Sequence, residues 1–135
     1  MQSMTPKKAK EALGLRPQGR LSKCPDLPNC VCSEYAEDRE HFTDALPISG
    51  DHTRVKAKLL ELIAQLKGAH LVENRENYLR VEMTSAIFRF VDDLEFRIDS
   101  KAKLIHLRSA SRLGRSDLGA NGRRVRKVHK LWQTI

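Results

Sequence analysis

The chain has 135 residues, 40% of them hydrophobic, and a formal net charge of +8 at pH 7. This length suits one domain with one core. Its apolar runs are far shorter than the roughly 20 residues of a membrane span, which excludes a transmembrane segment. Residues 1–15 contain lysines but no apolar signal region, so we expect a cytoplasmic protein; with a natural signal removed, the protein would be envelope-associated. The oligomeric state stays open.

The positive charge is concentrated at the C-terminal end. Residues 100–135 carry ten basic and one acidic side chain, whereas residues 34–99 carry nine basic and fourteen acidic ones. A basic segment attracts phosphate-rich partners through counterion release, so nucleic acid is a candidate partner. Aromatic residues make up only 5% of the chain, which leaves few stacking platforms. A solvated basic helix face is therefore favoured over nucleic-acid binding.

The first 50 residues show little periodicity. Residues 1–22 place Pro and Gly among basic residues and predict a flexible basic arm, followed by a single α+β domain over residues 23–135. Residues 23–50 contain three prolines, which indicates an ordered but irregular segment with a short strand near residues 41–48.

The rest of the chain predicts two helices and a sheet. Asp51 is suited to cap a helix that has apolar residues on one stripe and stops at Gly68. Asn121 is suited to cap a second helix over residues 123–134. Between them the apolar period becomes 2, and short connections favour antiparallel strands at residues 71–74, 78–84, 86–98 and 104–109. The predicted fold class is α+β, with an antiparallel sheet of four or five strands and two helices packed on one face.

Alternation along residues 86–98 divides the side chains between two faces. Asp92 shares the inward face with the apolar residues, whereas Asp93 and Glu95 point to the other face. A tight turn at Ser100 and Lys101 sets a register between this strand and the next. In this register apolar side chains face apolar ones, and polar side chains face polar ones. In that register the apolar face includes Phe88, Phe90, Leu94, Phe96 and Ile98, and the polar pairs are Asp92 with Ser109, Asp93 with Arg108, and Glu95 with His106.

Three segments carry a resemblance to a known family. They are Cys24-Pro25-Asp26-Leu27-Pro28-Asn29-Cys30, Asp92-Asp93-Leu94-Glu95-Phe96, and the stretch from Arg108 to Asn121 that reads RSASRLGRSDLGAN. In this order, over residues 21–131, they resemble the signature of the domain-of-unknown-function family 1499. The resemblance implies no activity; members are often secreted, lipid-anchored or plastid proteins. The chain departs from the family pattern at Gly122, Arg126 and Cys32, where the family usually has Arg, Glu and Ser.

The cysteines allow three interpretations. Cys24, Cys30 and Cys32 offer three thiolates for zinc, but their spacing is not the paired spacing of closed zinc sites. A disulfide between Cys24 and Cys30 fits the secreted members of the family that the chain resembles. In a reducing cytoplasm both would be packed thiols. We expect no metal and no cofactor.

The loop over residues 108–121 is the main candidate site. Its arginines offer planar guanidinium groups, its serines offer hydroxyl groups, and its glycines allow backbone amides to approach a ligand. The predicted ligand-binding residues are Arg108, Ser109, Ser111, Arg112, Asp117 and Asn121, with Asp92, Asp93 and Glu95 in support. The preferred function is a non-enzymatic binding or scaffolding domain that holds an anionic small molecule or a protein partner at this loop.

Three alternatives stay open at this point. The loop groups would equally serve to tie the last strand to the last helix. The basic C-terminal helix would serve a nucleic-acid-binding protein, whose affinity should fall steeply with salt. Asp92 and Asp93 would serve as the acid and base of a small hydrolase-like enzyme, although alternation points the two carboxyl groups in opposite directions.

Overall fold

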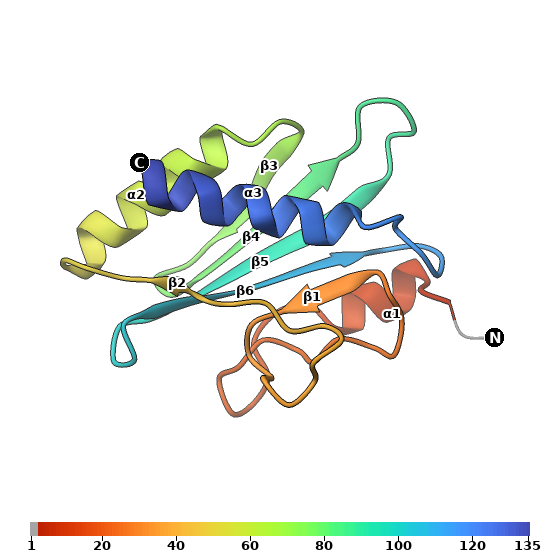
Figure 1. Ribbon diagram of the computed structural model, residues 1–135, viewed down its shortest axis with the longest axis horizontal. Coiled ribbons are helices and arrows are strands. Elements are labelled where there is room, and N and C mark those ends of the chain that lie inside the picture. The colour runs from red at the N-terminus through yellow and green to blue at the C-terminus, as the bar shows by residue number, and fades with distance from the viewer. Residues whose placement is uncertain (1–2) are drawn as a thin grey trace.

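The computed structural model describes residues 3–135, and a six-stranded antiparallel sheet forms its centre (Figure 1). The strand order is β1-β6-β5-β4-β3, and β2 pairs with β6 beside β1. The short β1 and β2 come from the segment expected to be irregular, which is why the sheet exceeds five strands. The strands are β1 Cys30–Cys32, β2 Leu46–Pro47, β3 Ala69–Asn74, β4 Tyr78–Thr84, β5 Val91–Asp99 and β6 Leu104–Ser111.

Two helices cover one face of the sheet, α2 at His52–Ala64 and α3 at Ala120–Thr134 (Figure 1). Asp51 caps α2 as the sequence predicts, because its carboxylate accepts the backbone N–H of Arg54 at 2.9 Å. The apolar stripes of both helices and alternate residues of β4, β5 and β6 form the main core. The predicted α+β class, with two helices on one face, is confirmed.

Gly68 sets how the end of α2 meets the sheet. Its φ is +78°, and a Cβ atom there would lie 2.3 Å from the carbonyl oxygen of Thr84. The backbone N–H of Thr84 donates to the Gly68 carbonyl at 2.9 Å. Only glycine allows this approach, which brings the turn after α2 against the end of β4.

The edge strand β3 contains an irregularity. Leu71 pairs with Val81, and Glu73 pairs with the next residue back along β4, Arg80. Val72 is therefore an extra residue without a partner opposite it, which is a β-bulge. The opposite edge of the sheet consists of the short strands β1 and β2, which both pair with β6.

The N-terminal residues lie against the face of the sheet opposite α2 and α3. Residues 3–22, where the sequence suggested a flexible arm, include the helix α1 at Pro6–Glu11 and the fully buried Leu21. The backbone N–H of Gly14 donates to the carboxylate of Glu95 at 2.8 Å. This face is polar, and the N-terminal residues cover part of it.

The predicted register between β5 and β6 is wrong by two residues. Asp93 faces Ala110, Glu95 faces Arg108, and Asp92 faces Ser111. The cause is the connection, which spans residues 100–103 with Lys103 at a φ of +58° and is longer than a two-residue turn. A shift of two keeps every side chain on its predicted face, so only the pairing changes.

The predicted strand over residues 86–98 begins too early. The structure starts β5 at Val91, and a loop over residues 85–90 leaves the rings of Phe88 and Phe90 largely exposed. The loop is closed by two hydrogen bonds, from Ser85 N to Phe90 O and from Phe90 N to the Ser85 hydroxyl. The two rings stack on each other at 5.7 Å instead of joining the core.

Candidate functional site

A polar cluster, buried except for the half-buried Asp117, lies where β6, the start of α3 and the segment before β1 meet. We define it as Asn29, Ser109, Ser111, Asp117 and Asn121. The amide oxygen of Asn121 accepts the Ser109 hydroxyl at 2.6 Å. Its amide nitrogen donates to the Asn29 carbonyl at 3.1 Å, the Ser111 hydroxyl at 3.0 Å and the Asp117 carboxylate at 2.8 Å. The fully buried Asn121 thus ties three separate segments together.

The cap of α3 differs from the prediction. Asn121 lies inside the first turn with its side chain turned into the cluster, and Gly119, at a φ of +83°, is the N-cap residue. The Asp117 carboxylate accepts the backbone N–H groups of Gly119 at 2.7 Å and Asn121 at 3.0 Å. Burial acts to raise the pKa of Asp117, but the hydrogen bonds from Asn121 and Gly119 outweigh it and lower the pKa.

Asp92 and Arg124 border the polar cluster. Arg124 Nη1 lies 2.9 Å from Asp92 Oδ2, and it also donates to Ser109 Oγ and Asn121 Oδ1. Asp92 points inward as predicted, but its partners are Arg124 and Ser111, not Ser109. Burial raises the pKa of Asp92 even though Arg124 opposes the shift. The carboxyl group is therefore held where its charged form is disfavoured.

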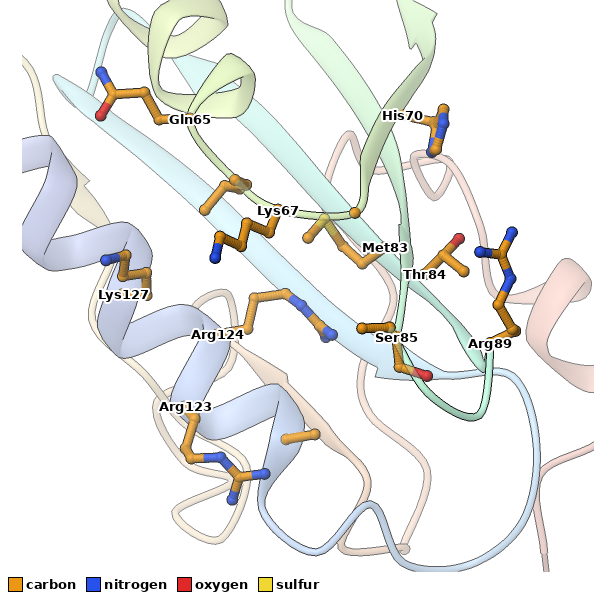
Figure 2. Close-up of a pocket in the computed structure, with 14 residues that line it drawn as sticks. Gln65, Lys67, His70, Met83, Thr84, Ser85, Arg89, Arg123, Arg124 and Lys127 are labelled. Carbon is orange, nitrogen blue, oxygen red and sulfur yellow. The ribbon is translucent and has the colours of Figure 1, made fainter.

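Two adjoining pockets open beside this group. The smaller pocket, of about 270 Å³, lies between residues 85–92 and residues 111–120, and Asp92 and Asp117 both line it. The larger pocket, of about 630 Å³, lies between the end of α2, the β4–β5 loop and α3 (Figure 2). We call it the basic pocket. The two pockets share the lining residues Ser85, Ala120 and Arg124.

All charged side chains that line the basic pocket are basic: Lys67, Arg89, Arg123, Arg124 and Lys127. Arg124 is paired with Asp92, and Arg123 donates to the Leu118 carbonyl at 2.7 Å. Within residues 3–135, the side chains of Lys67, Arg89 and Lys127 form no hydrogen bond or ion pair. Figure 2 shows these side chains around the opening, from the α2–β3 turn, the β4–β5 loop and α3. The arrangement offers uncompensated positive charge to a ligand.

Comparison with known families identifies a family that covers most of the chain. The model of a family described as protein of unknown function (DUF1499) covers residues 20–131. The chain belongs to the DUF1499 family. A comparison with curated proteins finds no match. The three segments that resemble the DUF1499 signature meet in space, because Asn29 comes from the first, Asp92 from the second, and Ser109 and Asn121 from the third.

The third DUF1499 segment does not form the predicted loop site. Ser109 and Ser111 point into the polar cluster, whereas Arg108 and Arg112 point to the opposite face, because neighbouring strand residues alternate. Arg112 donates to Asp93 at 2.8 and 2.9 Å and to Glu82 at 2.8 Å. The predicted ligand-binding residues Arg108, Ser109, Ser111, Arg112, Asp117 and Asn121 therefore do not converge on one ligand.

Arg108 and Glu95 form a buried pair beneath the N-terminal residues. Arg108 Nη1 lies 3.5 Å from Glu95 Oε1, and both side chains are almost wholly inaccessible to solvent. Glu95 also accepts the Tyr78 hydroxyl and the backbone N–H of Gly14. Burial raises the pKa of Glu95, with Arg108 opposing the shift. Since Asp93 also lies on this face, away from Asp92, the proposed Asp92–Asp93 acid–base pair does not form.

The first DUF1499 segment contains a disulfide between Cys24 and Cys30. Cys32 is free and buried, and burial raises its pKa to about 11, which keeps the thiol protonated at neutral pH. Within residues 3–135, no group of three or more His, Cys, Asp or Glu side chains is placed to hold a metal ion. The helices of the described residues include none that is long and apolar enough to cross a membrane.

Sequence reasoning missed the basic pocket of this DUF1499 protein. The charge excess of residues 100–135 pointed to α3, which supplies Arg123, Arg124 and Lys127. Lys67 and Arg89 lie in the acid-rich middle of the chain, where no pattern set them apart. Only the fold brings them to α3, through the turn at Gly68 and the loop before β5.

Proposed function

We propose that this protein is a non-enzymatic binding domain that holds an anionic small molecule in the basic pocket. The observation that carries the proposal is a pocket of about 630 Å³ whose five charged lining residues are all basic. This volume lies within the range of small-molecule sites. Guanidinium and ammonium groups at a partly enclosed site favour a phosphate or carboxylate group, with arginine able to donate two parallel hydrogen bonds.

The polar cluster supports this site from behind. Asp117 and Asn121 hold the first turn of α3 against β6, and Arg123 and Arg124 lie at the end of this turn and directly after it. Asp92 holds the Arg124 guanidinium at the boundary between the two pockets. The predicted loop thus contributes by fixing the helix that presents the cations, and the preferred anionic ligand moves from Arg108 and Arg112 to α3.

Thermal unfolding with inorganic phosphate and phenyl phosphate tests the proposal. A ligand at about 100 times its dissociation constant adds roughly 2.7 kcal/mol to the stability, which raises Tm measurably. Lys127→Gln should weaken binding about tenfold, because it removes one charge-assisted contact. Lys130→Gln is the matched control on the same helix outside the pocket lining and should bind as wild type. Equal effects of both variants, or no Tm shift with either anion, would refute the proposal.

The structure bears on the nucleic-acid alternative as well. That function needs a basic surface that continues from the N-terminal residues to α3, and those residues lie on opposite faces of the sheet. Duplex DNA binding that falls equally in Lys127→Gln and Lys130→Gln, and falls steeply with salt, would favour nucleic acid over the pocket.

Asp92 favours a hydrolase-like enzyme as the second candidate function. Asp92 lines the smaller pocket, and its raised pKa suits a general acid. Hydrolysis of para-nitrophenyl phosphate that is lost in Asp92→Asn would support this function. Absence of turnover by the wild-type protein would count against it.

A further inference from the structure

Apolar side chains are exposed on the two loops that border the pockets. We call them the apolar rim: Ile87, Phe88 and Phe90 on the β4–β5 loop, and Leu113 and Leu118 on the β6–α3 loop. Ile87 is 83% exposed, Phe88 73% and Leu118 86%. Both loops line the smaller pocket, and Figure 1 shows them at the same end of the sheet.

The apolar rim has no role in the core. Five of the nine large apolar side chains that are exposed within residues 3–135 belong to it. Scattered exposed apolar residues are ordinary, but a concentration on neighbouring loops marks an interaction surface. The rings of Phe88 and Phe90 stack on each other, and the hydrogen bond from Phe90 N to the Ser85 hydroxyl closes the loop that carries them. The loop therefore holds both rings away from the core.

Cations interleave with the apolar rim. Arg89 lies between Phe88 and Phe90 in the chain, has a φ of +57°, and lines the basic pocket (Figure 2). Arg123, on the other side of the opening, donates to the carbonyl of Leu118. Each loop therefore presents hydrocarbon next to positive charge, as proteins that bind the interface of an anionic membrane do.

We propose that this end of the molecule binds the surface of an anionic lipid bilayer. The apolar rim inserts at the level of the headgroups, and the basic pocket receives a lipid phosphate. This inference rests on the proposed function and names the class of its ligand. A second copy of the chain is a poorer partner, because it would bring two basic pockets together. Nucleic acid offers phosphates but no hydrocarbon environment for Ile87 and Leu118.

Sedimentation of the full chain with lipid vesicles tests the inference. Vesicles of phosphatidylcholine alone are compared with vesicles of equal parts phosphatidylcholine and phosphatidylglycerol, and phenyl phosphate binding is measured in parallel by Tm shift. We expect binding to the anionic vesicles only. The double variant Ile87→Ser with Phe88→Ser should lower the vesicle partition roughly tenfold or more and leave the Tm shift unchanged. Lys127→Gln should lower the vesicle partition about fivefold and weaken phenyl phosphate binding as well.

Two further variants complete the design. Leu118→Asn removes hydrocarbon from the second loop and suits its φ of +54°, so it should weaken vesicle binding without unfolding the chain. Leu15→Ser is the matched control, because Leu15 is exposed but follows Gly14, which lies on the other face of the sheet.

The outcomes separate this inference from the function on which it rests. Phenyl phosphate binding without vesicle binding would overturn the inference and leave the proposed function intact. Vesicle binding that is unchanged in Ile87→Ser with Phe88→Ser and in Leu118→Asn would show that the apolar rim does not insert into the bilayer, and it would overturn the inference. Failure of both assays would overturn both proposals. A stable dimer that dissociates on Ile87→Ser with Phe88→Ser would assign the rim to a second copy instead.

Discussion

Replacing Asn121 with Asp exchanges an amide nitrogen for an oxygen and barely changes the shape of the side chain. In the polar cluster that nitrogen faces three oxygens, on Asn29, Ser111 and Asp117, at 2.8 to 3.1 Å. A carboxylate oxygen there would be buried beside the Asp117 carboxylate. We expect Asn121→Asp to cost about 3–5 kcal/mol, because the new charge is buried beside Asp117 and the neighbouring cation, Arg124, is already paired with Asp92.

Truncation should be milder than this isosteric change. Asn121→Ala removes the hydrogen bonds and leaves partners unsatisfied, which costs about 2–3 kcal/mol, but it introduces no charge. Urea unfolding with the disulfide intact measures both free energies at pH 7 and at pH 5. The introduced carboxyl group has a folded-state pKa raised by burial and by Asp117. Its penalty should therefore shrink as pH falls through that pKa. Greater stability of Asn121→Asp than of Asn121→Ala at pH 7 would show that the amide is oriented the other way and would refute the network.

Three other predictions follow from the polar face and the disulfide. Asp93→Ala should cost about 3 kcal/mol in urea unfolding, because Asp93 is buried and holds two arginines; a loss below about 1 kcal/mol would contradict its burial. Burial acts to raise the pKa of Glu34, but hydrogen bonds from Arg97 lower it from 4.5. The stability it supplies is present above its unfolded pKa and lost as pH falls through the folded one. Acid titration of Glu34→Gln should thus show a shallower loss of stability below pH 4.5 than wild type. Replacing both Cys24 and Cys30 with Ser should lower the free energy of unfolding by about 2 kcal/mol, and an unchanged Tm under reducing agent would contradict this.

Periodicity predicted most of the fold. The strand at Tyr78–Thr84 appears with the predicted ends, and Asp51 caps the first core helix. The faces of β5 and β6 also follow from alternation, because a period of two fixes the face of every residue once one is known. The register between β5 and β6 was harder to predict, because a shift of two residues keeps every side chain on the same face. Only the length of the connection at residues 100–103 distinguishes the two registers.

The apolar alternation led to a wrong prediction at the loop before β5. Phe88 and Phe90 continue the apolar alternation of the strand, and nothing in the local sequence marks them as exposed. A hydrophobic pattern records where apolar residues occur, and it does not distinguish a core face from a surface that binds a partner.

The candidate site was only partly predictable. Asp92, Ser109, Ser111, Asp117 and Asn121 were identified as important polar residues, and four of them, Ser109, Ser111, Asp117 and Asn121, belong to the polar cluster that Asp92 borders. The arginines beside them in the chain were grouped with them by sequence proximity, although a strand separates neighbours to opposite faces. The basic pocket draws on three separate segments of the chain, residues 65–70, 83–89 and 120–127, so its detection needed the tertiary structure.

The bulge in β3 has a consequence for the behaviour of the protein in concentrated solution. An open sheet edge with exposed Leu71 and Val72 would recruit the same edge of another molecule into a continuous sheet. The unpaired Val72 interrupts the regular spacing of N–H and C=O groups along this edge, so an incoming strand finds no uniform template. Deleting Val72 would restore a regular edge, and we expect the variant to form sheet-rich aggregates more readily than the wild-type protein.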